Sequence, residues 1–282
     1  MTDPRSTSSV VVGIDGSPAA VEAARWAVDE AADRDLPLRL VYVIDEKSSD
    51  MIIKRQYAES ALRAATRAVH AAGKPVRIET SMPYGDVDEV LTVESRAAVL
   101  LCVGSVGIGR LAWTLLGSTA AGVAESVSCP VAIVRRTGEN QRAPRAIAVA
   151  VESSAGSDAA IDLAMREASL RHATVLAVGL WSAADPNMNC GDLDRRMEHW
   201  RADYPGVPVH VAFARDTLAG FLIHSGDPVQ LAVISTDADA FDRVGPVVER
   251  VIHHARCSVL MAPQPISQLI AARTGSTSSI VV

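Results

Sequence analysis

One segment of the chain combines residue types whose spacing suits the binding of a phosphate group. It contains glycines, a basic residue and two adjacent hydroxyl side chains: Gly104, Gly107, Gly109, Arg110, Gly117, Ser118 and Thr119. A bound phosphate needs backbone N–H groups that point at it, and glycine lets the backbone approach closely because it has no Cβ. Taken alone, the loop fits a structural turn as well as a phosphate site, since neither GxxxxGK[ST] nor GxGxxG is present.

The loop ends at the start of a predicted helix over residues 119–128. Free N–H groups and the positive end of the helix dipole favour a phosphate there, and the hydroxyls of Ser118 and Thr119 add hydrogen-bond donors. Arg110 is a phosphate candidate on its charge alone, and a solvated arginine explains it equally well.

Other candidate residues lie at the ends of predicted strands. Gly13 and Asp15 end the first strand, Val43 ends the second, and Val103 leads into Gly104 at the end of the fourth. Ligands of doubly wound sheets bind beyond the carboxyl ends of the strands, where the winding changes direction. We therefore expect these residues and the glycine loop to share one crevice.

The elements that must position these residues alternate between apolar runs and helical patterns. Ser17 is a good N-cap, and Pro18 suits the first position of the helix that follows. The pattern predicts strands at 10–15, 38–44, 76–82, 98–103 and 130–134, and helices at 17–34, 50–72, 86–96 and 119–128. This order favours a mostly parallel sheet with helices on both faces.

The same pattern repeats in the second half of the chain. A polar segment at 135–144 is typical of a linker, and the run at 146–153 then matches the first strand. Further strands are predicted at 174–180, 208–213 and 231–234, and a last one at the end of the repeat. We expect an α/β fold of two tandem doubly wound domains, each a five-stranded mostly parallel sheet with helices on both faces. The expected domains are residues 1–138 and 144–265, followed by a flexible tail at 266–282.

Composition excludes several classes of partner. The net charge is −6 and no run of Lys or Arg is present, so neither nucleic acid nor a membrane surface is an expected partner. The sequence contains no apolar stretch of about 20 residues and no secretory signal pattern. With four cysteines and no CxxC pair, the protein is expected to be cytoplasmic.

The spacing Gly104-x2-Gly107-x9-Gly117-Ser118 resembles the ATP-binding motif G-x2-G-x9-G-[ST] of the universal stress protein family. The opening VVVGIDGS, which contains Asp15, is similar to the first strand of that family, and the tandem layout resembles its two-domain actinobacterial members. The resemblance implies that the chain binds ATP together with Mg²⁺. It implies that Asp15 contacts the adenosine part, and that the backbone of Val43 hydrogen-bonds adenine. Gly104 and Gly107 would then surround the ribose and phosphates.

Further consequences of the resemblance concern the phosphate turn and the assembly. Gly117, Ser118 and Thr119 match the phosphate-binding turn. The two copies would pack as a pseudo-dimer through the segments near Val131–Val134 and Val259–Ala262, and a further homodimer of the chain fits the same family.

The second copy departs from the motif, and we expect it to bind no ATP. Glu152 stands where Asp15 stood, one methylene longer. The loop at 235–246 lacks the first two glycines and carries Asp237, Asp239 and Asp242, whose charge would repel a phosphate. Pro246 follows the one remaining glycine and offers neither an N–H nor a hydroxyl.

Three functions remain open. The first is a regulatory protein whose ATP occupancy shifts a conformation that an unidentified protein partner reads. The second is a slow ATPase, although no catalytic motif, general base or metal ligand set is recognisable. The third is a nucleotide-free interaction scaffold. The apolar cluster Met51-Ile52-Ile53 is expected to be core, with an exposed partner patch as the alternative.

Overall fold

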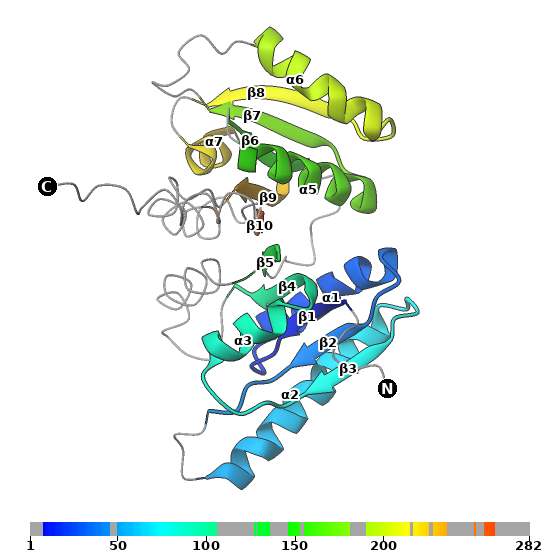
Figure 1. Cartoon of the computed structure of the whole chain (residues 1–282), viewed down its shortest axis with the longest axis vertical. Helices are drawn as coiled ribbons and strands as arrows, with labels where there is room; N and C mark the ends of the chain where they lie inside the picture. Colours follow the sequence, from blue (N-terminus) through cyan, green and yellow to red (C-terminus); the bar gives the residue numbers. More distant parts are fainter. Residues whose placement is uncertain are drawn as a thin grey trace, which may run out of the picture.

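The protein folds around one ten-stranded sheet with the strand order β3-β2-β1-β4-β5-β10-β9-β6-β7-β8 (Figure 1). The structure is a computed structural model. It describes residues 8–45, 50–105, 127, 129–135, 146–152, 155–180, 190–214, 217–225, 228–235, 251 and 257–262. The expected domain boundaries and the tail at 266–282 lie outside these residues.

The first half of the sheet consists of parallel strands. These are β1 (Ser9–Gly13), β2 (Leu38–Val41), β3 (Ile78–Ser81), β4 (Ala98–Gly104) and β5 (Val131–Val134). The described helices between them are α1 (Pro18–Asp33), α2 (Met51–Ala71) and α3 (Val87–Ser95). The predicted alternation is confirmed as far as β4 and for β5, and the helix predicted at 119–128 lies outside the described residues except for residue 127.

The second half repeats this arrangement. Its parallel strands are β6 (Ala146–Val151), β7 (Val175–Leu180), β8 (Val209–Ala214), β9 (Val229–Ser235) and β10 (Ser258–Ala262). The described helices are α5 (Ala155–Arg171), α6 (Cys190–Asp203) and α7 (Leu218–Ser225). The expected α/β fold with a mostly parallel sheet is therefore correct.

The halves meet where β5 and β10 pair antiparallel, which joins them into one sheet. Val259 pairs with Ile133 and Met261 with Val131, and the backbone N–H of Arg135 donates to the Ser258 hydroxyl at 3.0 Å. Because the two halves follow the same winding and meet through their last strands, they are related by a pseudo-twofold axis at this junction. The pairing of the last strands is as expected.

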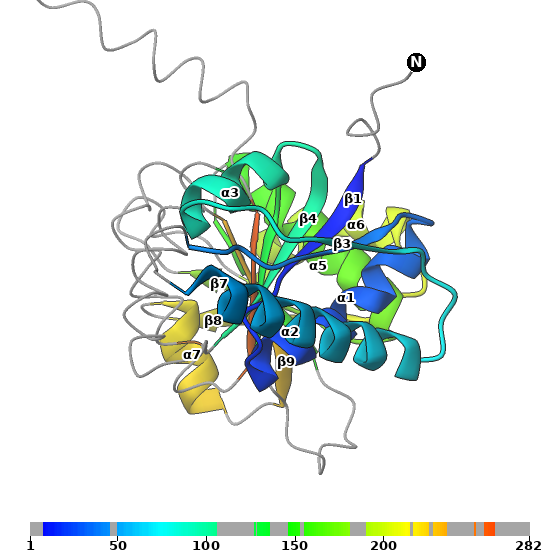
Figure 2. The ribbon, with the colours of Figure 1, turned by 90° about the horizontal axis from the view of Figure 1, so that it is seen from below.

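Helices cover both faces of the sheet (Figure 2). Side chains alternate along β1, so that Val10 and Val12 pack against α1 and α2 while Val11 packs in the other core with Leu91 of α3. Residues of α5 and α6 belong to the same buried cluster as α1 and α2, and residues of α7 to the same cluster as α3. Each face thus has one core that runs through both halves.

The start of α1 shows why the chain folds this way locally. The Ser17 hydroxyl accepts the backbone N–H of Ala20 at 3.1 Å, and Pro18 occupies the first helical position. The buried face of α1 is lined by alanine, including Ala23, Ala24 and Ala27, which lets the helix lie close to the strands. The predicted cap and helix are confirmed.

One expectation about side chains is wrong. Ile52 and Ile53 are 76% and 64% exposed, so the cluster at the start of α2 is not core. The first buried residue of α2 is Ala58, because the helix begins beyond the edge of the residues it packs on. Elsewhere, Trp26 of α1 packs partly buried against the core, and the guanidinium of Arg171 stacks on its ring at 4.2 Å from the centroid. Among the described residues, no helix is long and apolar enough to cross a membrane.

Candidate functional site

The winding of the first half changes direction between β1 and β4. The chain passes from β1 through α1 to β2 on one side, and from β4 to β5 on the other. The ends of the two central strands are neighbours: Val12 pairs with Cys102, and a Cβ on Gly13 would lie 3.4 Å from Val103 Cγ1. Gly13, Val103 and Gly104 thus meet at the place where open α/β sheets bind ligands.

Asp15 lies just beyond the end of β1 and is half-buried. The last hydrogen bond from this segment to β2 runs from the Ile14 N–H to the Val41 carbonyl at 2.8 Å. The Ser17 N–H then donates to Asp15 Oδ1 at 2.8 Å, which fixes the carboxylate at the mouth of the crevice. Gly16 has φ +87°, a conformation that glycine adopts without a steric penalty, and it turns the chain toward α1.

Val43 lies where β2 runs past the end of β1. The N–H groups of Tyr42 and Ile44 donate to Ser81 and Pro83 on the β3 side. Backbone groups alternate in direction along an extended chain, so the N–H and C=O of Val43 point the other way, toward β1. Among the described residues, no backbone hydrogen bond involves Val43. The Val43 backbone thus presents one donor and one acceptor on the β1 side of the chain, just beyond the end of β1.

Gly104 packs directly against the first turn of α1. A Cβ at this position would lie 2.6 Å from the carbonyl carbon of Ala19 and 2.7 Å from the backbone nitrogen of Ala20. Only glycine fits here without a shift of the backbone. The packing of β4 on α1 therefore explains this glycine without any ligand, and a role in nucleotide binding would be additional.

Two tyrosines that the sequence reasoning did not single out stand beside Asp15. The rings of Tyr42 and Tyr57 meet edge to face with centroids 6.2 Å apart. Burial raises the pKa of Tyr42, and the neighbouring Tyr57 and Asp15 raise it further. The Tyr57 hydroxyl lies 2.7 Å from where a Cβ of Gly16 would stand. Tyr57 comes from α2, and nothing in its local sequence marks it as a neighbour of residue 16.

The remaining predicted site residues cannot be placed. Gly107, Gly109, Arg110, Gly117, Ser118 and Thr119 lie outside the described residues. The chain enters their segment at Ser105, whose N–H donates to the Val134 carbonyl at 2.9 Å. The segment therefore begins at the carboxyl end of β4, next to Asp15 and Gly13.

The matching position of the second half is built differently. There the Glu152 N–H donates to the Ser157 hydroxyl at 3.0 Å, whereas in the first half the Asp15 carboxylate accepts a backbone N–H. The aspartates of the loop after β9, Asp237, Asp239 and Asp242, lie outside the described residues. Within the part of the chain that is described, no group of three or more His, Cys, Asp or Glu could hold a metal ion.

Comparison with known proteins places the chain among relatives. The family model for the universal stress protein family matches residues 7–135. The universal stress protein Rv2624c of Mycobacterium tuberculosis is 42% identical over 263 residues, which cover 90% of this chain and 95% of the relative. The universal stress protein Rv2028c of the same organism is 37% identical, with 94% and 99% covered. This chain belongs to the universal stress protein family.

A solved structure agrees with the fold over nearly the whole length. The crystal structure of a universal stress protein from Archaeoglobus fulgidus superimposes with a TM-score of 0.73 at 17% sequence identity. It covers 93% of this chain and 98% of that chain. At this identity the likeness concerns the fold alone.

Proposed function

We propose that the protein binds ATP in its first half and acts as a nucleotide-dependent regulatory switch in a stress or growth-arrest response. The observation that carries the proposal is the backbone of Val43. Its N–H and C=O point into the crevice beside Asp15 without a described protein partner. Adenine presents an exocyclic N–H donor and a ring nitrogen acceptor on one edge, which complements such a pair.

The described residues fit the adenosine end of the ligand. Asp15, fixed by the Ser17 N–H, would accept a hydrogen bond from a ribose hydroxyl. The ring of Tyr57 would limit the crevice on the α2 side. Gly13 would leave room for the ligand, because it places no side chain at the end of β1.

The phosphate end of the site belongs to the loop after β4. Gly104 and Gly107 would surround the ribose and the first phosphate, with Gly109 and Arg110 nearby. Gly117, Ser118 and Thr119 would bind the outer phosphates at a helix N-terminus. Mg²⁺ would accompany the ATP phosphates and neutralise part of their charge.

A regulatory role rather than an enzymatic one follows from the groups around the crevice. Tyr42 and Tyr57, the described side chains beside Asp15 and Gly16, are not suited to activate water for attack on a phosphate. A slow ATPase remains the second candidate, and a nucleotide-free scaffold the third. We place the protein in the cytoplasm, with the division into domains 1–138 and 144–265, an unidentified protein partner and a further homodimer as parts of the same proposal.

The decisive experiment combines two measurements on the full chain. Mass spectrometry of the small molecules released from the purified protein is expected to find an adenine nucleotide. Calorimetry with ATP and Mg²⁺ on the stripped protein is expected to give one site per chain. Asp15→Glu and Gly117→Ala are both expected to weaken binding. If the protein carries no nucleotide and none binds, the scaffold is the correct function.

A separate assay distinguishes the switch from the enzyme. Multiple-turnover release of ADP above the background rate, abolished by Gly117→Ala, would establish a slow ATPase. A stoichiometry of two nucleotides per chain would overturn the assignment of the site to the first half alone.

A further inference from the structure

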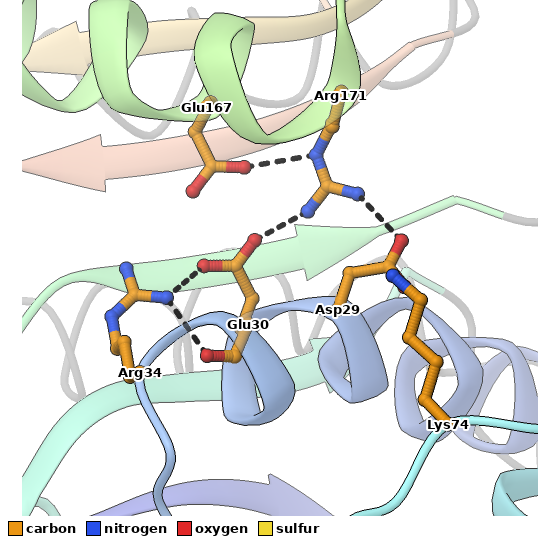
Figure 3. Close-up of polar contacts among 6 residues, drawn as sticks. All are labelled: Asp29, Glu30, Arg34, Lys74, Glu167 and Arg171. Carbon is orange, nitrogen blue, oxygen red and sulfur yellow. Dashed lines mark hydrogen bonds and ion pairs between the residues drawn. The ribbon is translucent and has the colours of Figure 1, made fainter.

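A cluster of charged side chains is buried where the two halves of the chain meet, between α1 and α5 (Figure 3). Glu30 of α1 is 0% exposed and Glu167 of α5 is 1% exposed. Arg171 of α5 donates from Nε to Glu167 Oε2 at 2.9 Å and from Nη2 to Glu30 Oε1 at 2.5 Å. Arg34 donates to the other carboxylate oxygen of Glu30. The cluster therefore links residues 141 positions apart in the sequence.

The cluster reflects the pseudo-twofold axis. Glu30 follows Asp15 by the same number of residues as Glu167 follows Glu152, and an arginine comes four residues after each glutamate. Both Glu–Arg pairs are i,i+4 ion pairs on their own helix. The axis thus brings two equivalent acidic side chains to face each other in the interior.

The position of the two carboxyl groups favours a shared proton. Both are buried, and both accept hydrogen bonds from the single guanidinium of Arg171, so they lie close together. An ionised carboxylate only accepts hydrogen bonds, and a carboxyl group donates one only when it is protonated. Two facing carboxylates in a dry interior also repel each other, as in sites where paired carboxylates share a proton.

We propose that Glu30 and Glu167 form a proton-binding site that joins the two halves of the chain. At neutral pH the pair holds one proton and carries a single negative charge. That charge is balanced by Arg171, which contacts both carboxyl groups, while the more exposed Arg34 also pairs with Glu30.

Other charged and titratable groups surround the pair. On α1, Asp29 forms an ion pair with Arg171 at 3.6 Å and another with Lys74, which lies after α2, at 2.9 Å. On β4, burial and then the charges of Glu30 and Glu167 raise the pKa of the Cys102 thiol well above its usual value, so this group stays neutral. The pKa of Glu167 is raised as well, to about 8. Burial is the largest cause, the charge of Glu30 adds to the rise, and the charge of Arg171 opposes it.

The proton makes the stability of the folded chain depend on pH. In the unfolded chain a glutamate releases its proton near its ordinary pKa of 4.5, whereas the folded chain keeps it up to a pH of about 8. Folding takes up a proton between these values. The contribution to stability is therefore fully present below the unfolded pKa and is lost as the pH rises through about 8. One proton changes the folding equilibrium constant roughly tenfold per pH unit in this window.

Denaturant unfolding of the full chain between pH 5 and 9 tests the proposal through Glu167→Gln, whose amide has a similar shape and stays neutral over the whole range. The ratio of the folding constant of Glu167→Gln to that of the wild type is expected to rise by roughly tenfold per pH unit up to about pH 8 and to level off above it. The control is Glu59→Gln, at a glutamate of α2 that also pairs with arginines at i,i+4 spacing but is 39% exposed. For the control the ratio is expected to stay constant.

A measurement on the unaltered protein covers the case in which the variant fails to fold. Infrared spectra at pH 7 are expected to contain the C=O stretch of a protonated carboxylic acid that is shielded from water, and this band is expected to disappear above about pH 8. A wild type without this band overturns the proposal. So does a Glu167→Gln ratio that is constant across the pH range.

Discussion

A Cβ on Gly104 would lie 2.6 Å from the carbonyl carbon of Ala19, so the end of β4 and the first turn of α1 are in direct backbone contact. This contact lies at the carboxyl end of β4, where the winding of the sheet changes direction. It also fixes the first turn of α1, which follows Asp15, against the end of β4. The geometry of the candidate site thus depends on packing that involves no ligand.

Gly104→Ala is therefore expected to destabilise the protein even without nucleotide. The added methyl group meets backbone atoms that cannot turn aside, and overpacking of this kind costs about 1–3 kcal/mol. Denaturant unfolding of the nucleotide-free chain measures the change. The control is Gly206→Ala, where a Cβ would meet nothing within 4 Å. Equal stability of Gly104→Ala and the wild type would contradict the close contact.

The backbone of Val43 provides a second test. Val43→Pro removes the N–H that points into the crevice, and we expect ATP affinity to fall roughly tenfold or more, since a lost hydrogen bond leaves its partner unsatisfied at a cost of about 1–3 kcal/mol. Val43→Ala keeps the N–H and is expected to bind ATP nearly as well as the wild type. Calorimetry compares the two, with thermal unfolding as a check on folding. Strong loss of affinity in Val43→Ala would show that the side chain, not the backbone, is required.

Tyr57 provides a third test of the adenosine end. Its ring is held edge-on to Tyr42 and its hydroxyl lies beside Gly16. We expect Tyr57→Ala to weaken ATP binding by roughly threefold to tenfold, because an aromatic contact contributes about 0.5–1.5 kcal/mol beyond its buried area. Tyr84→Ala is the matched control, since both tyrosines are 46% exposed and Tyr84 follows β3 rather than facing Asp15. The same loss in both variants would remove Tyr57 from the site.

Local signals in the sequence are sufficient for the described elements that lead to the candidate site. Ser17 and Pro18 mark the start of α1, and apolar runs mark the strands that bring Gly13 and Val103 together. The start of α2 was misjudged because an apolar triplet does not reveal whether a neighbour covers it, and Ile52 extends past its neighbours instead. Tyr57 was missed because its contact with residue 16 depends on how α2 lies on the sheet.

The buried charge cluster shows a different limit of the sequence. The helical spacing of α1 places Glu30 on the same face as Ala27 and Ala31, which are both buried. A glutamate on such a face is explained only by its partner, and that partner is Arg171 in the other half. Nothing local connects the two residues. The antiparallel pairing of β5 and β10 determines which residues of α1 and α5 meet.

Arg171→Met is the fourth test and concerns the junction of the halves. This guanidinium contacts Glu167, Glu30 and Asp29 with a side chain that is only 10% exposed. Its loss leaves buried carboxyl groups without their main positive partner, and breaking a buried ion pair from one side costs about 3–5 kcal/mol. Methionine retains much of the length that covers Trp26 but none of the charge. The free energy of unfolding is therefore expected to fall by that amount at neutral pH.

The matched control for Arg171→Met is Arg195→Met on α6. Arg195 is 73% exposed and pairs with Asp192 at 3.0 Å, and an exposed pair of this kind contributes less than about 1 kcal/mol. Denaturant unfolding at neutral pH measures the loss in both variants. A loss no larger than that of Arg195→Met would mean that Arg171 does not hold the two halves together.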